Sequence, residues 1–228
     1  MNFSEIDRLL LPAPLALEMG YERLPSGVLH IACRTDLHRC SGAMFEWWFQ
    51  SRPLTQQYVW WHPVDHLSSE WLNTQDGTHL GSMHKVEERF SGTPAKQLLI
   101  QMRDPLEFFS ATALSAARES NAVSGLICGR GGESWQAPRA PDGRIMGSRL
   151  IHVARDTEWG CALRSHFFLG EDLPMIGKSA SEIASMIGDE VGPALLQHCY
   201  DEFTFLSRFL PSLYIAENRE TIPVQLPW

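Results

Sequence analysis

The sequence lacks the features that would point to a nucleic acid, a membrane or export. Lysines and arginines form no cluster and the formal net charge is −8, which argues against binding to duplex DNA or an anionic membrane surface. No apolar stretch approaches the length of a membrane span, and the first residues show no basic start followed by an apolar run. We therefore expect an unexported protein whose partner is a small molecule, with no nucleic acid and no membrane involved.

Cysteine is also scarce, and phosphate-binding motifs are absent. The five cysteines are odd in number, widely spaced and never arranged as C-x-x-C, which favours free thiols in a reducing cytoplasm over a disulfide framework. The glycine-rich stretch 129–147 has neither the Walker lysine nor the ordered glycines of a dinucleotide-binding loop. We interpret it as a long surface loop.

What the sequence does contain is enough apolar material for one sizeable core. Its 228 residues are 44% hydrophobic and 20% charged, which is typical of a globular chain rather than a disordered one. The 8 tryptophans could wall a roomy interior suited to a flat organic ligand. We expect an irregular N-terminal arm over residues 1–42 and one domain over residues 43–228, and the sequence leaves open whether that domain forms a homodimer.

Many short apolar segments precede one long amphipathic segment. Strands are expected at 57–63, 82–90, 95–105 and 108–120, the last with a helical alternative, and a hairpin at 149–170; residues 43–49 could be strand or helix. A helix is expected from Pro193, which suits a first turn, to Pro211, which should end it. This order predicts an α+β domain in which a curved antiparallel sheet wraps the C-terminal helix and leaves an internal cavity.

Two polar residues interrupt the apolar stripe of that helix. In "QHCYDEFTFLSRFLPSLY", His198 and Glu202 share the 3-4 spacing of Leu195, Phe205 and Phe209. Side chains four apart lie on one helix face and can converge on a single ion. By itself such a pair is more often a weak surface interaction, but an unpaired carboxylate buried in this stripe would be costly, and a metal ion would relieve that cost.

Further metal ligands are available in two other stretches. The polar candidates of "YVWWHPVDH" and "HKVEERF" are His62, Asp65, His66, His84, Glu87 and Glu88. Alternation along a strand puts Glu88 on the face of His84 and Glu87 on the solvated face, so Glu88 is the preferred inward carboxylate. His62 competes with His66, and a bulge or a one-residue shift would exchange Glu87 for Glu88.

These stretches together resemble the 2,4-diacetylphloroglucinol hydrolase and phloretin hydrolase family of zinc-dependent carbon–carbon bond hydrolases. The similar segments are "MFEWWF", "YVWWHPVDH", "HKVEERFSG", "RDTEWGCALRSHFFLG" and "HCYDEFTFLSRFLP". The resemblance implies a Bet v 1-like helix-grip fold and one zinc ion, Zn2+, held by two histidines and two glutamates. Carried over to this sequence, that ligand set is His66, Glu88, His198 and Glu202.

The resemblance also implies a chemistry and residues that support it. In the family, zinc polarises a ketone and delivers water to it while the ring departs in its keto tautomer. The catalytic residues expected here are Tyr58, which would hydrogen-bond a phenolic oxygen, Glu88, and His152, a proton donor titrating near neutrality, with His166 as the alternative donor. Tyr58 could equally be a core tyrosine whose hydroxyl is hydrogen-bonded within the protein.

Substrate contacts are expected along the same segments. They are Tyr58, Trp60, His62, His166 and Phe167. Phe167 and Phe168 stand where the resemblance leads us to expect a substrate-orienting tyrosine, a departure that favours a less hydroxylated aromatic or a polyketide ketone.

The sequence thus predicts a metal-dependent hydrolase that cleaves a carbon–carbon bond in an acylated phenol or related polyketide-type ketone and releases a carboxylic acid. Two alternatives stay open. One is a non-enzymatic helix-grip protein that binds an aromatic or polyketide ligand, since the same fold can carry ligands without catalysis. The other is a metal-dependent cyclase acting on a related polyketide.

Overall fold

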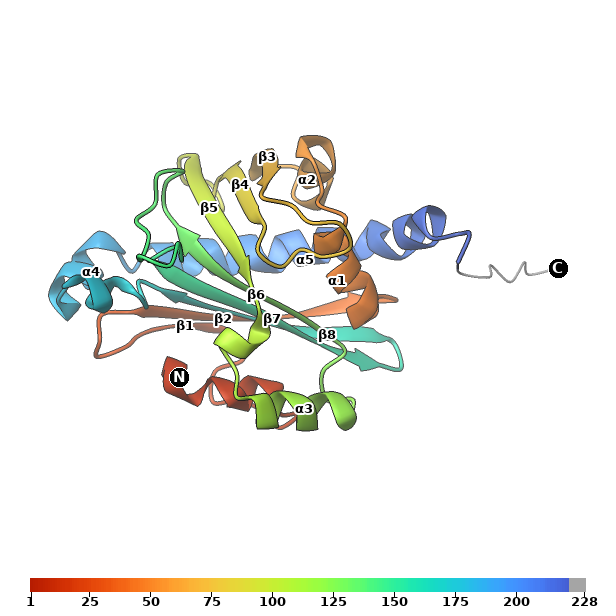
Figure 1. Ribbon diagram of the computed structural model, residues 1–228, viewed down its shortest axis with the longest axis horizontal. Helices are drawn as coiled ribbons and strands as arrows, with labels where there is room; N and C mark the ends of the chain where they lie inside the picture. Colours follow the sequence, from red (N-terminus) through yellow and green to blue (C-terminus); the bar gives the residue numbers. More distant parts are fainter. Residues whose placement is uncertain (222–228) are drawn as a thin grey trace.

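Eight antiparallel strands form one curved sheet in a computed structural model that describes residues 1–221 (Figure 1). The strand order across the sheet is β1-β2-β8-β7-β6-β5-β4-β3. The strands are β1 (Gly20–Arg23), β2 (Leu29–His38), β3 (His66–Leu72), β4 (Met83–Glu88), β5 (Lys96–Arg103), β6 (Gly125–Gly132), β7 (Ser148–Thr157) and β8 (Gly160–Leu169). The α-helices are α1 (Gly42–Gln50), α2 (Thr55–Trp61), α3 (Ala111–Glu119), α4 (Ala180–Met186) and α5 (Val191–Glu217), with 3-10 helices at Phe3–Leu10, Pro105–Glu107 and Leu173–Ile176.

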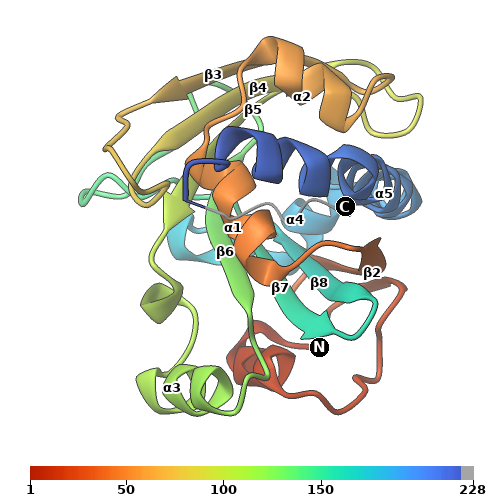
Figure 2. The ribbon, with the colours of Figure 1, turned by 90° about the vertical axis from the view of Figure 1, so that its right-hand side faces the viewer.

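The long helix α5 runs along the concave side of the sheet, together with α1 and α2 (Figure 2). Its buried stripe, which includes Leu195, Phe203 and Leu206, packs in the same core as inward residues of the strands such as Ile31 and Val86. From β2 to α5 the order is one strand, two helices, six strands and the long helix, with α3 inserted between β5 and β6 and α4 before α5, which is a helix-grip arrangement. The α+β fold class predicted from the sequence is therefore confirmed.

The convex side of the sheet carries a second core. The N-terminal 3-10 helix and α3 pack there with outward residues of β6, β7 and β8, among them Leu126, Val153 and Phe168. Residues 1–42 are thus not merely an arm: β1 and β2 are integral strands, and β2 pairs with β8 over its whole length. The expected boundary at residue 42 does not separate two structural units, because the first inner strand already lies before it.

The strand predicted at 57–63 is wrong, because these residues form α2. Strand alternation would bury Tyr58, Trp60 and His62, whereas the structure buries Tyr58 and Trp61, one helical turn apart, and leaves Trp60 46% exposed. Residues 43–49 lie in α1, and residues 111–119 adopt the helical alternative, with Ser110 capping α3. The strands predicted at 82–90, 95–105 and the hairpin at 149–170 are confirmed as β4, β5, β7 and β8.

The helix predicted to stop at Pro211 continues to Glu217. Pro193 does lie in its first turn, but Pro211 lies inside the helix. A proline removes one backbone donor, and the carbonyl of Ser207 that would have paired with it is instead contacted by the Cys40 thiol at 3.9 Å. Buried Leu210 and the ring of Tyr214, which packs on Trp47, hold the helix on both sides of the proline.

Two composition-based predictions can be compared with residues 1–221. All five cysteines are buried and none forms a disulfide, as predicted. No helix in this range combines the length and apolar character required to cross a membrane.

Candidate metal centre

Two pairs of side chains, one from the sheet and one from α5, meet in the concave interior. His66 at the start of β3 is the direct cross-strand partner of Glu88 at the end of β4. His198 and Glu202 lie four residues apart on α5, on its buried face. The Nε2 atom of His66 is 3.6 Å from Oε2 of Glu202 and 3.8 Å from Oε2 of Glu88. We call these four residues the concave cluster.

His66 is held so that one ring nitrogen is free. Its Nδ1 lies 2.9 Å from the backbone carbonyl of Tyr58, an acceptor, so Nδ1 carries the proton and Nε2 is the unprotonated nitrogen of the neutral ring. The Tyr58 ring stacks on the imidazole with centroids 3.7 Å apart and fixes its plane. Buried Nε2 has no hydrogen-bond partner among the described residues, which is costly unless a ligand completes it.

His198 is oriented by a carboxylate behind it. Its Nδ1 lies 3.0 Å from Oδ2 of Asp65, which also accepts the backbone N–H of Ser91 at 2.9 Å. A carboxylate bound to one imidazole nitrogen fixes the tautomer and turns the other nitrogen toward a metal. His66, His198 and Glu202 each offer one ligand atom, all within 4.8 Å of one another, and all three are buried.

Burial makes charge expensive for these side chains when no cation is bound. It raises the pKa of Glu202 well above its usual value, and the neighbouring Glu88 carboxylate adds to that rise. Burial likewise raises the pKa of Glu88 and lowers that of His66 well below its usual value. A bound divalent cation would offset the cost of charging these two carboxyl groups, and the free imidazole nitrogen beside them is a further donor for such an ion.

Tyr58 joins the cluster through its hydroxyl as well as its ring. The hydroxyl donates a hydrogen bond to Oε2 of Glu88. Burial, followed by the nearby Glu88 charge, raises the pKa of Tyr58 well above its usual value. Tyr58 therefore stays protonated and acts as a hydrogen-bond donor.

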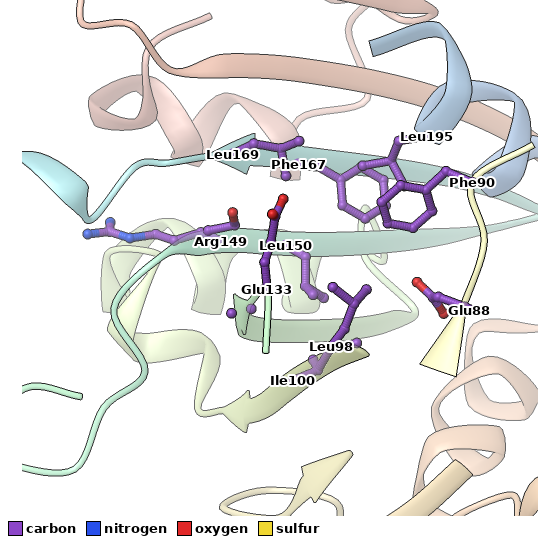
Figure 3. A pocket seen from close by; sticks show the side chains of 13 residues that line it. Glu88, Phe90, Leu98, Ile100, Glu133, Arg149, Leu150, Phe167, Leu169 and Leu195 are labelled. Carbon is purple, nitrogen blue, oxygen red and sulfur yellow. The ribbon is translucent and has the colours of Figure 1, made fainter. Parts of the chain in front are cut away.

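An apolar pocket opens beside the concave cluster (Figure 3). Glu88 of β4 lies at one side of it, and its apolar lining comes from β5 (Leu98, Ile100), β7 (Leu150) and β8 (Phe167, Leu169). Phe90 and Leu195 also line it, and the Phe90 ring makes an edge contact with His198, with centroids 5.3 Å apart. Of the predicted substrate contacts, Phe167 thus lies in this pocket.

His152 occupies a different environment from the one expected. It is buried among Phe45, Phe49, Phe167 and Phe203, and its Nδ1 lies 2.8 Å from the Ser165 hydroxyl. Burial lowers the pKa of His152 to about 3. It is therefore neutral near pH 7. The expectation that His152 titrates near neutrality is wrong.

The structure does not bring His166 or Trp60 to the pocket. His166 alternates with Phe167 on β8, so it points to the convex side, where its Nδ1 lies 3.0 Å from Nε2 of His30. Trp60 lies on the outer side of α2 against Phe209. His62 is buried and stacks on His198 with ring centroids 5.0 Å apart, so it contacts the concave cluster without being one of its four residues.

The structure places the alternative residues in different surroundings, although His62, Asp65 and His198 form a second group with metal-ligand spacing. His66, not His62, faces the two glutamates, and Glu88 is buried whereas Glu87 is partly exposed. The role of Asp65 was not anticipated: the sequence placed it among candidate ligands, but only the fold shows that it binds His198 from behind. Its spacing, one residue before His66, is the one signal that the sequence contained.

The helix-grip fold thus places a buried histidine–carboxylate cluster, with the spacing of metal ligands, beside an apolar pocket. The family profile described as "DAPG hydrolase PhiG domain" matches residues 1–215, and the chain belongs to this family. The resemblance drawn from the motifs, and the predicted class of carbon–carbon bond hydrolase, are thereby confirmed.

Two relatives carry the same name. A 2,4-diacetylphloroglucinol hydrolase of a Pseudomonas species is 26% identical over 234 residues, covering 93% of this chain and 76% of the relative. The protein of that name from Pseudomonas protegens is also 26% identical, covering 93% of this chain and 73% of its own length.

Solved structures are similar only at low identity. Ara h 8.0201 matches with a TM-score of 0.44 at 11% identity, covering 81% of this chain and 99% of that chain. The di-domain ARO/CYC protein BexL matches with a TM-score of 0.45 at 10% identity, covering 81% of this chain and 50% of that chain.

Proposed function

We propose that this protein is a zinc-dependent hydrolase that cleaves a carbon–carbon bond next to a ketone, in an acylated phenol or related polyketide-type compound, and releases a carboxylic acid. The observation that carries the proposal is the unpartnered Nε2 of His66, buried between the carboxylates of Glu88 and Glu202. The two relatives are named for such a reaction on 2,4-diacetylphloroglucinol.

The ligands proposed for zinc are His66, Glu88, His198 and Glu202. When bound, zinc would act as a Lewis acid toward the ketone oxygen and lower the pKa of a bound water. Two imidazoles and two carboxylates are typical zinc donors. Asp65 would keep His198 in the ligating orientation, and the Tyr58 carbonyl would do the same for His66.

The other side chains bind and orient the substrate. Tyr58 would offer its hydroxyl proton to a substrate oxygen, since the hydroxyl is protonated and already aimed at Glu88. The apolar wall with Phe167 excludes bulk water from the scissile bond. Over the whole reaction water is divided between the products: hydroxyl goes to the acyl carbon, giving the acid, and a proton goes to the carbon that departs.

The role that we propose for His152 differs from the proton donor suggested by the sequence. A neutral imidazole with a pKa of about 3 is not a strong acid at neutral pH. It would instead act as a positioning residue, by packing against Phe167 and holding that ring in the pocket wall.

The metal content of the purified protein tests the proposal. We expect about one zinc per chain by plasma mass spectrometry, and loss of that zinc in Glu202→Ala. Asp201→Ala is the matched control, since it removes a carboxylate from the neighbouring helix position outside the concave cluster.

Product analysis separates the hydrolase from the two alternatives. A hydrolase releases one carboxylic acid per ketone consumed, a cyclase releases water, and a binding protein releases neither. Full zinc occupancy without acid from any acyl phenol or 1,3-diketone would count against the hydrolase.

A further inference from the structure

A second group of buried side chains lies directly behind the concave cluster. His62, Asp65 and His198 each offer one possible ligand atom, and these atoms lie within 4.8 Å of one another. Oδ2 of Asp65 is common to both contacts in the group: it lies 3.0 Å from Nδ1 of His198 and 3.5 Å from Nε2 of His62. His198 and Asp65 already have a part in the proposed metal site, whereas His62 does not.

The hydrogen bonds of His62 decide which of its ring nitrogens carries the proton. The backbone N–H of Asp65 donates to Nδ1 of His62 at 3.1 Å, so Nδ1 carries no proton and the ring is neutral. The ring proton is therefore on Nε2, and the nearby acceptor is Oδ2 of Asp65. Their separation of 3.5 Å exceeds that of an ordinary hydrogen bond, and Nε2 has no hydrogen-bond partner within residues 1–221. The contact is thus an electrostatic attraction between an N–H group and a carboxylate.

The position of that proton argues against a second metal ion between the three side chains. An ion could bind Nε2 of His62 only by removing the proton, which would leave an imidazolate ring, whereas histidine ordinarily binds metals as the neutral imidazole. Nδ1 of His198 likewise faces the Asp65 carboxylate with a proton. The group therefore consists of two N–H donors directed at one carboxylate oxygen, rather than of three ligands.

The turn in which His62 lies fixes the direction of its ring. His62 is the C-cap residue of α2, and its backbone carbonyl accepts the N–H of His66 at 3.1 Å while its ring accepts that of Asp65. The buried ring lies 6° from parallel to the ring of His198 and meets the edge of Phe205. The turn and α5 together hold Nε2 of His62 toward Asp65.

We infer that His62 is a positioning residue for the proposed metal ligand His198. The Nε2 proton of His62 attracts Oδ2 of Asp65 and keeps this oxygen beside Nδ1 of His198, so that His198 presents its Nε2 to the ion. His62 contacts neither the ion nor the substrate in this role, which replaces the substrate contact expected from the sequence, since His62 does not line the pocket. This inference rests on the metal site of the proposed function and extends that site by one residue.

Two substitutions of His62 separate the N–H donor from the turn. His62→Asn keeps an acceptor near the position of Nδ1 and so preserves the turn, but it removes the donor to Asp65. His62→Gln places an amide N–H near the position of Nε2. Zinc affinity, measured by competition with a chelator, should fall about three- to tenfold in His62→Asn and stay within about twofold of the wild type in His62→Gln. His79→Asn is the matched control, because His79 is buried and precedes the end of β4 opposite to Glu88.

The same substitution in an Asp65→Asn background distinguishes positioning from packing. With the carboxylate removed, His62→Asn should lower zinc affinity by less than about twofold more, because the proton of His62 then has no charge to attract. A packing role would lower the affinity equally in both backgrounds, and that result would overturn the inference.

The zinc content of the same samples separates this inference from the proposed function. We expect about one zinc per chain at saturation in the wild type and in His62→Asn. Two zinc ions in the wild type and one in His62→Asn would overturn the inference, because they would show an ion bound to His62. One zinc in both proteins with equal affinity would also overturn it and would leave the proposed metal site standing. A wild type that binds no zinc would overturn both.

Discussion

Both faces of the sheet bury histidines, yet only one face has the makings of a chemical site. On the concave side, His66 and His198 meet two buried carboxylates and an apolar pocket. On the convex side, His30 and His166 bind each other, and the carboxylate within reach, Glu22, is 43% exposed. A buried histidine is therefore a weak signal by itself; convergence of buried carboxylates on its free nitrogen makes the difference.

The packing around the two histidine pairs, His30–His166 and His66–His198, also differs. On the convex side, the His30 ring stacks on Phe168 under the N-terminal segment, so its surroundings are those of an ordinary core. On the concave side, Tyr58 and Asp65 hold His66 and His198 by their Nδ1 atoms and leave Nε2 for a ligand. We expect substitutions on the two faces to separate function from stability.

The largest effect should come from removing a proposed ligand. His198→Ala should lower activity by roughly a thousandfold or more and abolish zinc binding, because the remaining donors cannot complete the site. His166→Ala on the convex side should keep activity within about threefold and destabilise the fold by about 1–3 kcal/mol through lost packing and hydrogen bonding. Zinc content, steady-state rates and urea unfolding measure zinc binding, activity and stability in turn. A comparable loss of zinc in both variants would contradict the difference proposed between the two faces.

A smaller effect should follow from loosening His198 without removing it. Asp65→Asn keeps the size of the side chain but removes the charge behind the imidazole, so zinc affinity should fall by about 10–100-fold. Activity should recover when zinc is raised to saturation, which loss of a direct ligand would not permit. Competition with a chelator measures the affinity, and an unchanged zinc affinity would show that Asp65 has no positioning role.

Acid should destabilise the protein through its buried histidines, and His152 offers a clean case. Its pKa is lowered by burial to about 3, against about 6.5 when unfolded, so stability is fully present above pH 6.5 and is lost as the pH falls toward 3. In that window each such histidine costs about 1.4 kcal/mol per pH unit. His152→Leu should therefore lose part of the acid dependence of unfolding between pH 6.5 and pH 5, whereas Leu54→Ala, at an exposed position that carries no titratable group, should keep it. Urea unfolding at the two pH values measures the effect, and parallel slopes in both variants would contradict it.

The smallest effect is expected at Trp60, which the sequence suggested as a substrate contact. Because it is 46% exposed and packs against Phe209 outside the pocket, Trp60→Ala should change KM by less than about twofold. Phe167→Ala, in the pocket, is the contrasting variant. A large rise in KM for Trp60→Ala would mean that substrate also occupies the outer side of α2.

Most predictions of helices, strands and inward-facing residues came from the spacing of apolar residues, and so did the main errors. Helical spacing identified His198 and Glu202, and strand alternation chose Glu88 over Glu87, because both patterns follow from local backbone geometry. The aromatic run around Tyr58 has no clear period, since aromatic residues fit a strand or a buried helix equally well, and the run proved to be α2. Pro211 was taken as a stop because its local cost is certain, whereas the packing that offsets it comes from distant residues.

The sequence by itself determined the helix pair, the α+β class and the family, and favoured Glu88 over Glu87, because each depends on local spacing or on motifs of a few residues. Only the tertiary structure decided that His66 rather than His62 faces the glutamates, that Asp65 stands behind His198, and that His166 lies on the opposite face from Phe167. These depend on which surfaces of residues far apart in the chain are brought together, and no local pattern encodes that. The pocket is the same kind of fact: it exists because Glu88 of β4 and Leu195 of α5 meet the apolar side chains that β5, β7 and β8 turn inward.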